Sequence, residues 1–305
     1  MGYGRDAELL AGTRFRRPFT EGDELRDDAS PAGVFLFLAG AAGLFAETPF
    51  GPHPVARLSA PFLADLRSVL GGSPGVSRVR PEAGAAAVFL PADEARALVF
   101  DPGAAGGAFR RVALASLTTA IRETNTSLHR FFDGRAAVPV SSDPTRARTI
   151  ETDVDPARAR DFFETAGLDP AILPSLGLTA KTVLPGAALA RAGDAGHEAY
   201  LLVEGRLRVS IDIAGAGEEA LAILKPGEIV GEMPLVDEAP RSADVYAHGW
   251  PAVVYVLTRE TFQRLLGTGA PEGAALLGGL TLLLSRRLEE VIKKAAGFRI
   301  LAGPI

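Results

Sequence analysis

The chain repeats one hydrophobic pattern about 165 residues apart, and this repetition restricts its fold more than any other feature. The apolar run Phe35–Leu38 precedes Gly40, as Tyr200–Val203 precedes Gly205. At an offset of 166 residues the similarity then continues without a gap through six pairs: Leu58 and Leu224, Leu63 and Ile229, Val69 and Leu235, Leu70 and Val236, Pro74 and Pro240, Val79 and Val245. Solenoid units are shorter, about 20–50 residues, so the pattern indicates duplication of a whole domain.

The order of the expected elements is the same in both halves. Gly33–Gly40 is a compact apolar run that predicts a buried strand, with Ala41–Ala46 as its expected hairpin partner. Each half ends with a predicted strand, Ala86–Leu90 or Ala252–Leu257, and then a predicted helix. Those helices are expected at Ala108–Phe132 and Gly273–Ala296. The alternative is two unrelated β domains with a similar hydrophobic rhythm, but the shared order favours duplication.

The segment Gly231–Val245 carries the residues best suited to bind a ligand. Gly231 permits close approach of a ligand to the backbone, and the adjacent Glu232 can accept hydrogen bonds from sugar hydroxyls. Arg241 follows nine residues later with a planar set of donors that suits a phosphate. Turn amides between these residues complete an expected anion-binding concavity.

This segment resembles the phosphate-binding cassette of the cyclic nucleotide-binding domain family, and the spacing from Gly-Glu to Pro-Arg matches without a gap. The resemblance implies two tandem jelly-roll (β-roll) domains, mainly β with flanking helices. It also implies that Glu232 holds the ribose hydroxyl and that Arg241 pairs with the cyclic phosphate. The candidate ligand-binding residues are Gly231, Glu232, Met233, Leu235, Arg241 and Ser242.

The segment departs from the family pattern at three positions. Val230 replaces an aromatic residue, and Pro234 lacks the N–H that this position donates to the phosphate in the family. Asp244 replaces a Ser or Thr, so a carboxylate is expected close to the anion. Ser242 lies where the family's choice of base is influenced, and it leaves both cAMP and cGMP as candidate ligands.

The first half lacks the binding chemistry of the second. Asp65 and Leu66 stand opposite Gly231 and Glu232, and Gly75 stands opposite Arg241. The first repeat is therefore predicted to be a degenerate cyclic nucleotide-binding fold with a structural or partner-binding role.

The composition excludes several other classes of function. The 305 residues carry a net charge of -5, which does not indicate a basic nucleic-acid-binding face, and they include no cysteine for thiol chemistry. No apolar run is long enough to span a membrane and no signal peptide is apparent, so the expected location is cytoplasmic. The four histidines show no metal-ligand spacing, and no catalytic motif is present, so neither a metal nor enzymatic activity is predicted.

The predicted domains are residues 1–135, a linker at 136–155 that is rich in Pro, Ser, Thr and charge, and residues 156–305. A helix is expected at Pro156–Leu168 before the second roll, and the Gly273–Ala296 helix is assigned to the second domain. That amphipathic helix can pack on its roll, form a dimer seam or cover the ligand base. No output domain is recognised after it.

The sequence predicts a non-enzymatic regulatory module that binds cAMP or cGMP in its second domain and needs no cofactor. Ligand binding would move the closing helix, and a protein partner or a second copy would respond. Neither nucleic acid nor membrane is an expected partner. The alternative is an interaction scaffold in which Glu232 and Arg241 pair with each other and the pockets bind no cyclic nucleotide.

Overall fold

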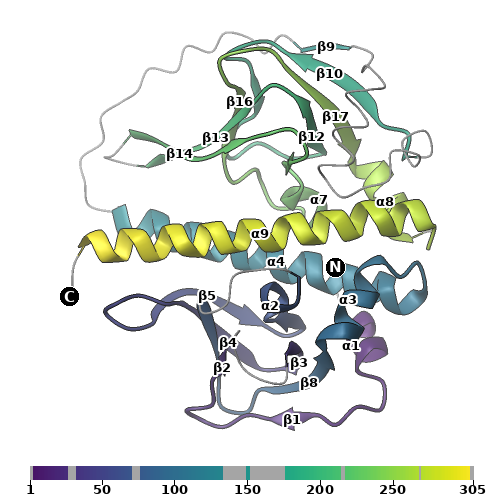
Figure 1. Cartoon of the computed structure of the whole chain (residues 1–305), viewed down its shortest axis with the longest axis vertical. Coiled ribbons are helices and arrows are strands. Elements are labelled where there is room, and N and C mark those ends of the chain that lie inside the picture. The colour runs from purple at the N-terminus through teal and green to yellow at the C-terminus, as the bar shows by residue number, and fades with distance from the viewer. Residues whose placement is uncertain are drawn as a thin grey trace. The chain divides into compact units, whose positions relative to one another are not determined.

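The computed structural model describes residues 3–26, 32–70, 76–132, 149–151, 176–213, 217–267 and 269–302. It divides into two compact units (Figure 1). Unit 1 combines Met1–Arg130 with Gly269–Ile305, and unit 2 is Phe131–Thr268. In the described part of the chain, no helix has the length and hydropathy needed to cross a membrane.

Unit 1 contains two four-stranded antiparallel sheets, with strand orders β1-β8-β3-β6 and β2-β7-β4-β5. The strands are β1 (Arg17–Pro18), β2 (Leu25–Arg26), β3 (Gly33–Ala39), β4 (Ala41–Ala46), β5 (His53–Ser59), β6 (Phe62–Ala64), β7 (Ser77–Pro81) and β8 (Ala86–Pro91). The predicted hairpin of β3 with β4 is wrong. The chain changes sheets at Gly40, whose φ of 76° turns the backbone there.

Unit 2 contains a five-stranded sheet of order β15-β12-β17-β10-β9 and a four-stranded sheet of order β11-β16-β13-β14. The strands are β9 (Thr149–Glu151), β10 (Thr179–Val183), β11 (Ala188–Ala190), β12 (Glu198–Glu204), β13 (Leu207–Ile213), β14 (Gly217–Leu224), β15 (Ile229–Val230), β16 (Asp244–Ala247) and β17 (Ala252–Thr258). Strand β9 lies within the predicted linker, yet it pairs with β10. The rest of that linker and the predicted helix at 156–168 lie outside the described residues.

The two units share one strand topology. Replacing β1, β8, β3 and β6 by β10, β17, β12 and β15 reproduces the first sheet, and β2, β7, β4 and β5 become β11, β16, β13 and β14 in the second. The long central strand is irregular between Phe37 and Ala39 in unit 1, and between Leu202 and Glu204 in unit 2. Such irregularities are positional features of a fold. The prediction of two tandem β-rolls, mainly β with flanking helices, is confirmed.

Within each unit, helices pack beside the strands (Figure 1). They are α1 (Gly4–Ala11), α2 (Leu66–Leu70), α3 (Ala92–Phe100), α4 (Ala104–Phe132), α7 (Met233–Asp237), α8 (Arg259–Gly267) and α9 (Pro271–Ala302). The structure groups α9 differently from the sequence analysis, which placed this helix with the second domain. Its packing partners are α2, α3, β4 and β5, all in unit 1. Gly278 permits this close packing, because a Cβ there would lie 2.6 Å from the Phe100 ring.

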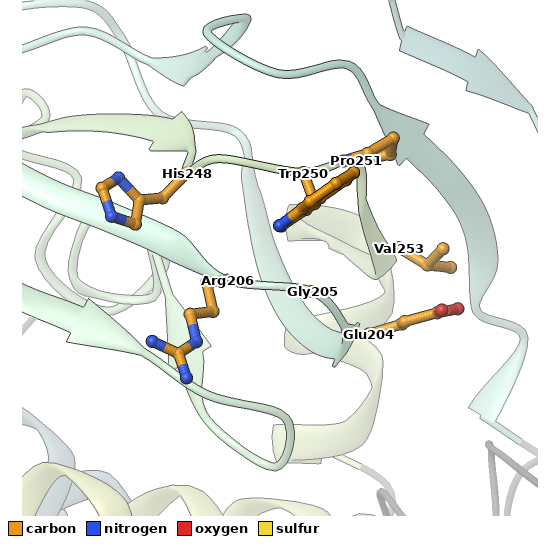
Figure 2. A pocket seen from close by; sticks show the side chains of 7 residues that line it. All are labelled: Glu204, Gly205, Arg206, His248, Trp250, Pro251 and Val253. Atoms are coloured by element: carbon orange, nitrogen blue, oxygen red, sulfur yellow. The ribbon is translucent and has the colours of Figure 1, made fainter.

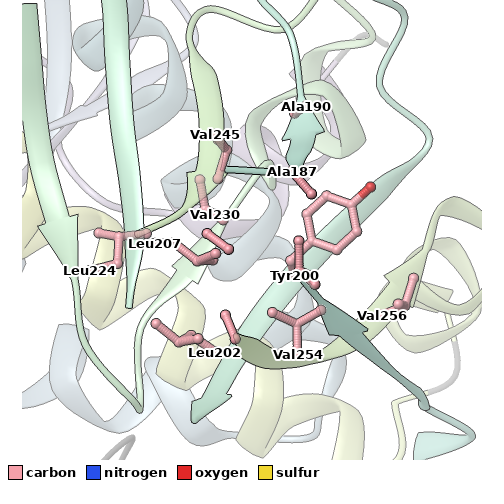
Figure 3. Packing of buried hydrophobic residues seen from close by; sticks show 13 residues of the cluster. Ala187, Ala190, Tyr200, Leu202, Leu207, Leu224, Val230, Val245, Val254 and Val256 are labelled. Carbon is pink, nitrogen blue, oxygen red and sulfur yellow. The ribbon is translucent and has the colours of Figure 1, made fainter. Parts of the chain in front are cut away.

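The interiors of the two rolls differ in chemistry. In unit 1 the rings of Phe19, Phe37 and Phe62 stack in series, with centroids 5.4 and 4.4 Å apart. In unit 2 the interior is a cluster of small aliphatic side chains with Tyr200 as its aromatic member (Figure 3). Leu202 there occupies the strand position that Phe37 holds in unit 1.

Candidate functional site

The Gly231–Val245 segment forms a turn, one short helix and a return strand, which we call the cassette. Strand β15 ends at Val230, and Gly231 then takes a φ of 78° that favours glycine. Glu232 precedes α7, whose first turn accommodates Pro234 because the N–H groups there need no partner in the helix. The helix ends at Glu238 in a left-handed conformation, and the chain returns through Arg241 into β16.

The side chain of Arg241 is buried under the cassette, with 8% of the residue's surface exposed. Its Nη1 donates to the carbonyl of Gly231 at 2.7 Å, and its Nη2 donates to the carbonyl of Glu198 at 2.6 Å. The guanidinium carbon lies 5.7 Å from the centroid of the Tyr200 ring, within range of a cation–π interaction. The arginine therefore joins the cassette to the start of β12.

The backbone of Arg241 makes a second connection to the loop between β11 and β12. Its N–H donates to the carbonyl of Asp194, and its carbonyl accepts from the N–H of Gly193, both at 2.9 Å. Gly196 in the same loop lies against the cassette so closely that a Cβ would be 2.5 Å from Pro234. The loop and the cassette consequently form one packed structure around the guanidinium.

The remaining predicted site residues lie in the same short segment. Glu232 is 1% exposed, and its carbonyl accepts from the N–H of Leu235 at 3.0 Å. Met233 and Leu235 are buried, and Ser242 is half-buried between Arg241 and β16. The cassette thus carries one acidic and one basic side chain, Glu232 and Arg241, both of them buried. Their roles towards a ligand stay predictions.

Asp244 lies on the face of β16 opposite the core cluster. Strand β16 alternates, so that Val245 and Ala247 belong to the core cluster while Asp244 and Tyr246 lie on the opposite face. The Asp244 carboxylate accepts from the N–H of Ala192 at 2.7 Å and from the Tyr246 hydroxyl at 3.1 Å. The period of two along a strand directs this side chain away from the core, and its position relative to a bound anion stays a prediction.

Arg259, the first residue of α8, is a part of the site that sequence reasoning missed. Its Nη2 donates to the carbonyls of Gly196 at 2.7 Å and Pro234 at 3.0 Å. Its Nη1 lies 3.8 Å from a carboxylate oxygen of Glu238. This one side chain therefore joins the loop, the cassette and α8, and no motif spacing in the sequence indicated it.

The ring of Tyr200 packs against the buried guanidinium of Arg241. Its hydroxyl donates to the Glu198 carboxylate at 2.9 Å and lies 3.3 Å from the Leu189 carbonyl. Burial raises the pKa of the Tyr200 phenol well above its usual range, and the nearby Glu198 carboxylate adds to that rise. The ring therefore stays neutral and keeps its hydroxyl as a donor at physiological pH.

The equivalent segment of unit 1 keeps the backbone geometry but changes the side chains. Asp65 stands at the position of Gly231 and has a φ of 66°. The nearby arginine is Arg67 on α2, whose Nη2 donates to the Ser77 hydroxyl at 2.7 Å. Its Nη1 lies 3.9 Å from the carboxylate of Glu289 on α9, and both residues are buried. Gly75, opposite Arg241, lies outside the described residues.

Comparison with known proteins gives the same assignment for the second roll. The family profile of the cyclic nucleotide-binding domain matches residues 180–268. The chain is similar to the cyclic AMP receptor protein of Thermus thermophilus, with 37% identity over 98 residues, which are 32% of this chain and 43% of the relative. It is also 37% identical over 83 residues to the cAMP-dependent protein kinase regulatory subunit of Colletotrichum orbiculare, covering 27% of this chain and 20% of the relative.

Among solved structures, a cyclic nucleotide-binding domain from Methylobacillus flagellatus aligns with a TM-score of 0.45 and 23% identity, over 52% of this chain and 90% of that one. The chain spans less than half the length of the two curated relatives that it matches.

Proposed function

Because residues 180–268 belong to the cyclic nucleotide-binding domain family, we propose that unit 2 binds cAMP or cGMP at the cassette. The phosphate would lie against Arg241, and the ribose against Glu232. The observation that carries this proposal is the buried guanidinium of Arg241, which lies beside a residue that must be glycine. An arginine held in this way is already largely dehydrated, so its charge acts strongly on a nearby anion.

The phosphate would accept hydrogen bonds from N–H groups of Arg241 that are not used in bonds within the protein. A guanidinium has five N–H groups, and the bonds to Gly231 and Glu198 use one on each terminal nitrogen. The geometry around Arg241 therefore favours two modes of binding. The anion either takes the remaining donors or displaces one of the two carbonyls.

Two of the departures from the family pattern differ in their expected effect on ligand affinity. Pro234 cannot donate an N–H to the phosphate, so binding would depend more heavily on Arg241. Asp244 faces away from the core and accepts two hydrogen bonds of its own, so its carboxylate would not repel the ligand. The net effect is a working phosphate site with one donor fewer than the family pattern provides.

The signal would leave the site through Arg259. This side chain holds the loop carbonyl of Gly196 and the cassette carbonyl of Pro234 from the first residue of α8. A ligand that shifts the cassette would change this anchor and bias the position of α8, and α9 follows directly in the chain. α9 belongs to unit 1 and packs on α2, α3, β4 and β5, so unit 1 would take part in the response. The protein would act as a regulatory module rather than as an enzyme.

Isothermal titration calorimetry with cAMP and cGMP tests the proposal. We expect micromolar affinity for at least one nucleotide and a loss of about 10- to 150-fold in Arg241→Ala, the range for a charge-assisted hydrogen bond. Arg57→Ala is a control, because Arg57 makes an exposed ion pair with Glu82 in unit 1, outside the cassette. It should bind like the wild type.

Absence of binding to either nucleotide by the folded wild-type protein would contradict the proposal. That result would favour the scaffold function, because Arg241 would then serve only to hold the carbonyls of Gly231 and Glu198. The protein partner or homodimer, the lack of nucleic-acid binding and the cytoplasmic location stay predictions.

A further inference from the structure

Unit 2 has a hollow of about 490 Å³ at the end of the roll where two turns meet (Figure 2). One turn joins β12 to β13 and contributes Glu204 and Arg206, and the other joins β16 to β17 and contributes His248 and Trp250. None of these residues belongs to the cassette. The volume lies within the range of small-molecule sites, about 300–1,000 Å³.

Unit 1 contains the same pair of turns. The N–H of His248 donates to the carbonyl of Arg206 at 2.9 Å, and the N–H of Glu82 donates to the carbonyl of Ala41 at 2.8 Å. Glycine with positive φ begins both crossings, Gly205 at 82° and Gly40 at 76°. The first repeat therefore provides an internal comparison for the side chains of the second.

The side chains at these matched positions differ sharply. Arg206 corresponds to Ala41, and the strand pairing matches Glu204 with Ala39 and Val253 with Ala86. The turn of unit 1 has only Ala83-Gly84 where unit 2 has Gly249-Trp250-Pro251. Glu82 corresponds to His248, but the counterparts of Arg206, Glu204 and Val253 in unit 1 are alanine, so the architecture does not require large side chains at these three positions.

Trp250 is the strongest sign that this surface binds something. It is the only tryptophan of the chain, and 79% of it is exposed. Tryptophan presents a large planar apolar face, and exposed aromatic side chains beside arginine are typical of binding surfaces. A ring stacked on its face would remove that surface from water.

The charged side chains around the hollow indicate which end of a ligand would face which side. Figure 2 shows the ring nitrogen of Trp250 on the side of His248 and Arg206, with Glu204 and Val253 on the other side. In the described part of the chain, the guanidinium of Arg206 and the imidazole of His248 make no ion pair. Three donor groups, the guanidinium, the imidazole and the indole N–H, therefore line the first side, and the Glu204 carboxylate disfavours an anion on the second.

We propose that this hollow is a second ligand site, which takes a planar heteroaromatic ring bearing a phosphate, such as a nucleoside monophosphate. The ring stacks on Trp250 and extends towards Val253, and the phosphate lies among Arg206, His248 and the indole N–H. Stacking on an aromatic side chain tolerates any base. The site does not require the ring of a cyclic phosphate, and it is independent of nucleotide binding at the cassette.

The fluorescence of Trp250 tests the proposal directly, because no other residue of the chain is a tryptophan. AMP is the probe. We expect saturable quenching by AMP, with at least about tenfold weaker quenching by adenosine, which lacks the phosphate. Arg206→Ala should weaken the binding of AMP by a similar factor. Arg241→Ala should leave the AMP titration unchanged, which separates this site from the cassette.

Calorimetry with Trp250→Ala completes the test, and this exposed substitution should not disturb folding because the matching turn of unit 1 closes with alanine and glycine. The heat of AMP binding should be lost in Trp250→Ala and retained in Arg57→Ala, which changes an exposed residue of unit 1. Quenching that is linear in AMP, or equal for AMP and adenosine, or unchanged in Arg206→Ala, would overturn the proposal. It would stand if cAMP failed to bind at the cassette.

Discussion

Replacing Gly231 by alanine should destabilise unit 2 by much more than its conformation alone explains. A Cβ at Gly231 would lie 2.3 Å from Nη1 of Arg241, and 3.3 Å from the Glu198 carbonyl. The side chain must therefore move and give up its bond to the Gly231 carbonyl, which costs about 1.5–3 kcal/mol for a charged donor. The positive φ adds about 1–2 kcal/mol. The expected total is about 2.5–5 kcal/mol.

Gly186 provides the matched control. Its φ is 73°, it lies in the same unit, and a Cβ there would have nothing within 4 Å. Gly186→Ala should therefore cost only about 1–2 kcal/mol, so the difference between the two variants isolates the displacement of Arg241. Urea unfolding followed by the emission of Trp250 reports on unit 2 alone, because the chain has no other tryptophan.

Two results would refute this reasoning. One is equal destabilisation by Gly231→Ala and Gly186→Ala, which would mean that the guanidinium does not occupy the space beside Gly231. The other is a Gly231→Ala penalty that persists unchanged when Arg241 is also replaced by alanine. In the double variant the clash has no partner, so the two substitutions should be strongly non-additive.

Three further predictions concern other parts of the two rolls. Asp244→Ser should leave cAMP affinity within about twofold, because the carboxylate lies on the outer face, and a tenfold gain by calorimetry would contradict this. Arg67→Met should destabilise unit 1 by about 1–3 kcal/mol, because it removes the buried donor to Ser77 and one of the two cations beside Glu289, which keeps Lys293, whereas Arg57→Met at an exposed pair should change little; equal urea midpoints by circular dichroism would count against the buried pair. Because the folded-state pKa of Tyr200 is raised, stability should be complete below about pH 10 and fall as the pH rises further, with a shallower fall in Tyr200→Phe; parallel pH profiles would exclude this phenol as the cause.

The sequence was sufficient to predict the duplication and the position of the cassette. Apolar runs that recur at a fixed offset mark side chains that face a core in each half. The structure agrees, because both units have the same strand order. The glycine-bounded strand ends were also readable, because a positive φ selects glycine, as at Gly40 and Gly205. The degenerate first site followed from the loss of Gly and Glu at Asp65 and Leu66.

The tertiary structure alone determined which groups meet. Arg259 is distant in sequence from the Gly196 and Pro234 carbonyls that it binds, and hydrogen bonds to backbone carbonyls leave no signature in residue types. The grouping of α9 with unit 1 was equally hidden, because an amphipathic stripe says that a helix packs but not on which surface. Local patterns fix what each segment becomes, whereas the partner of each segment depends on contacts between residues far apart in the chain.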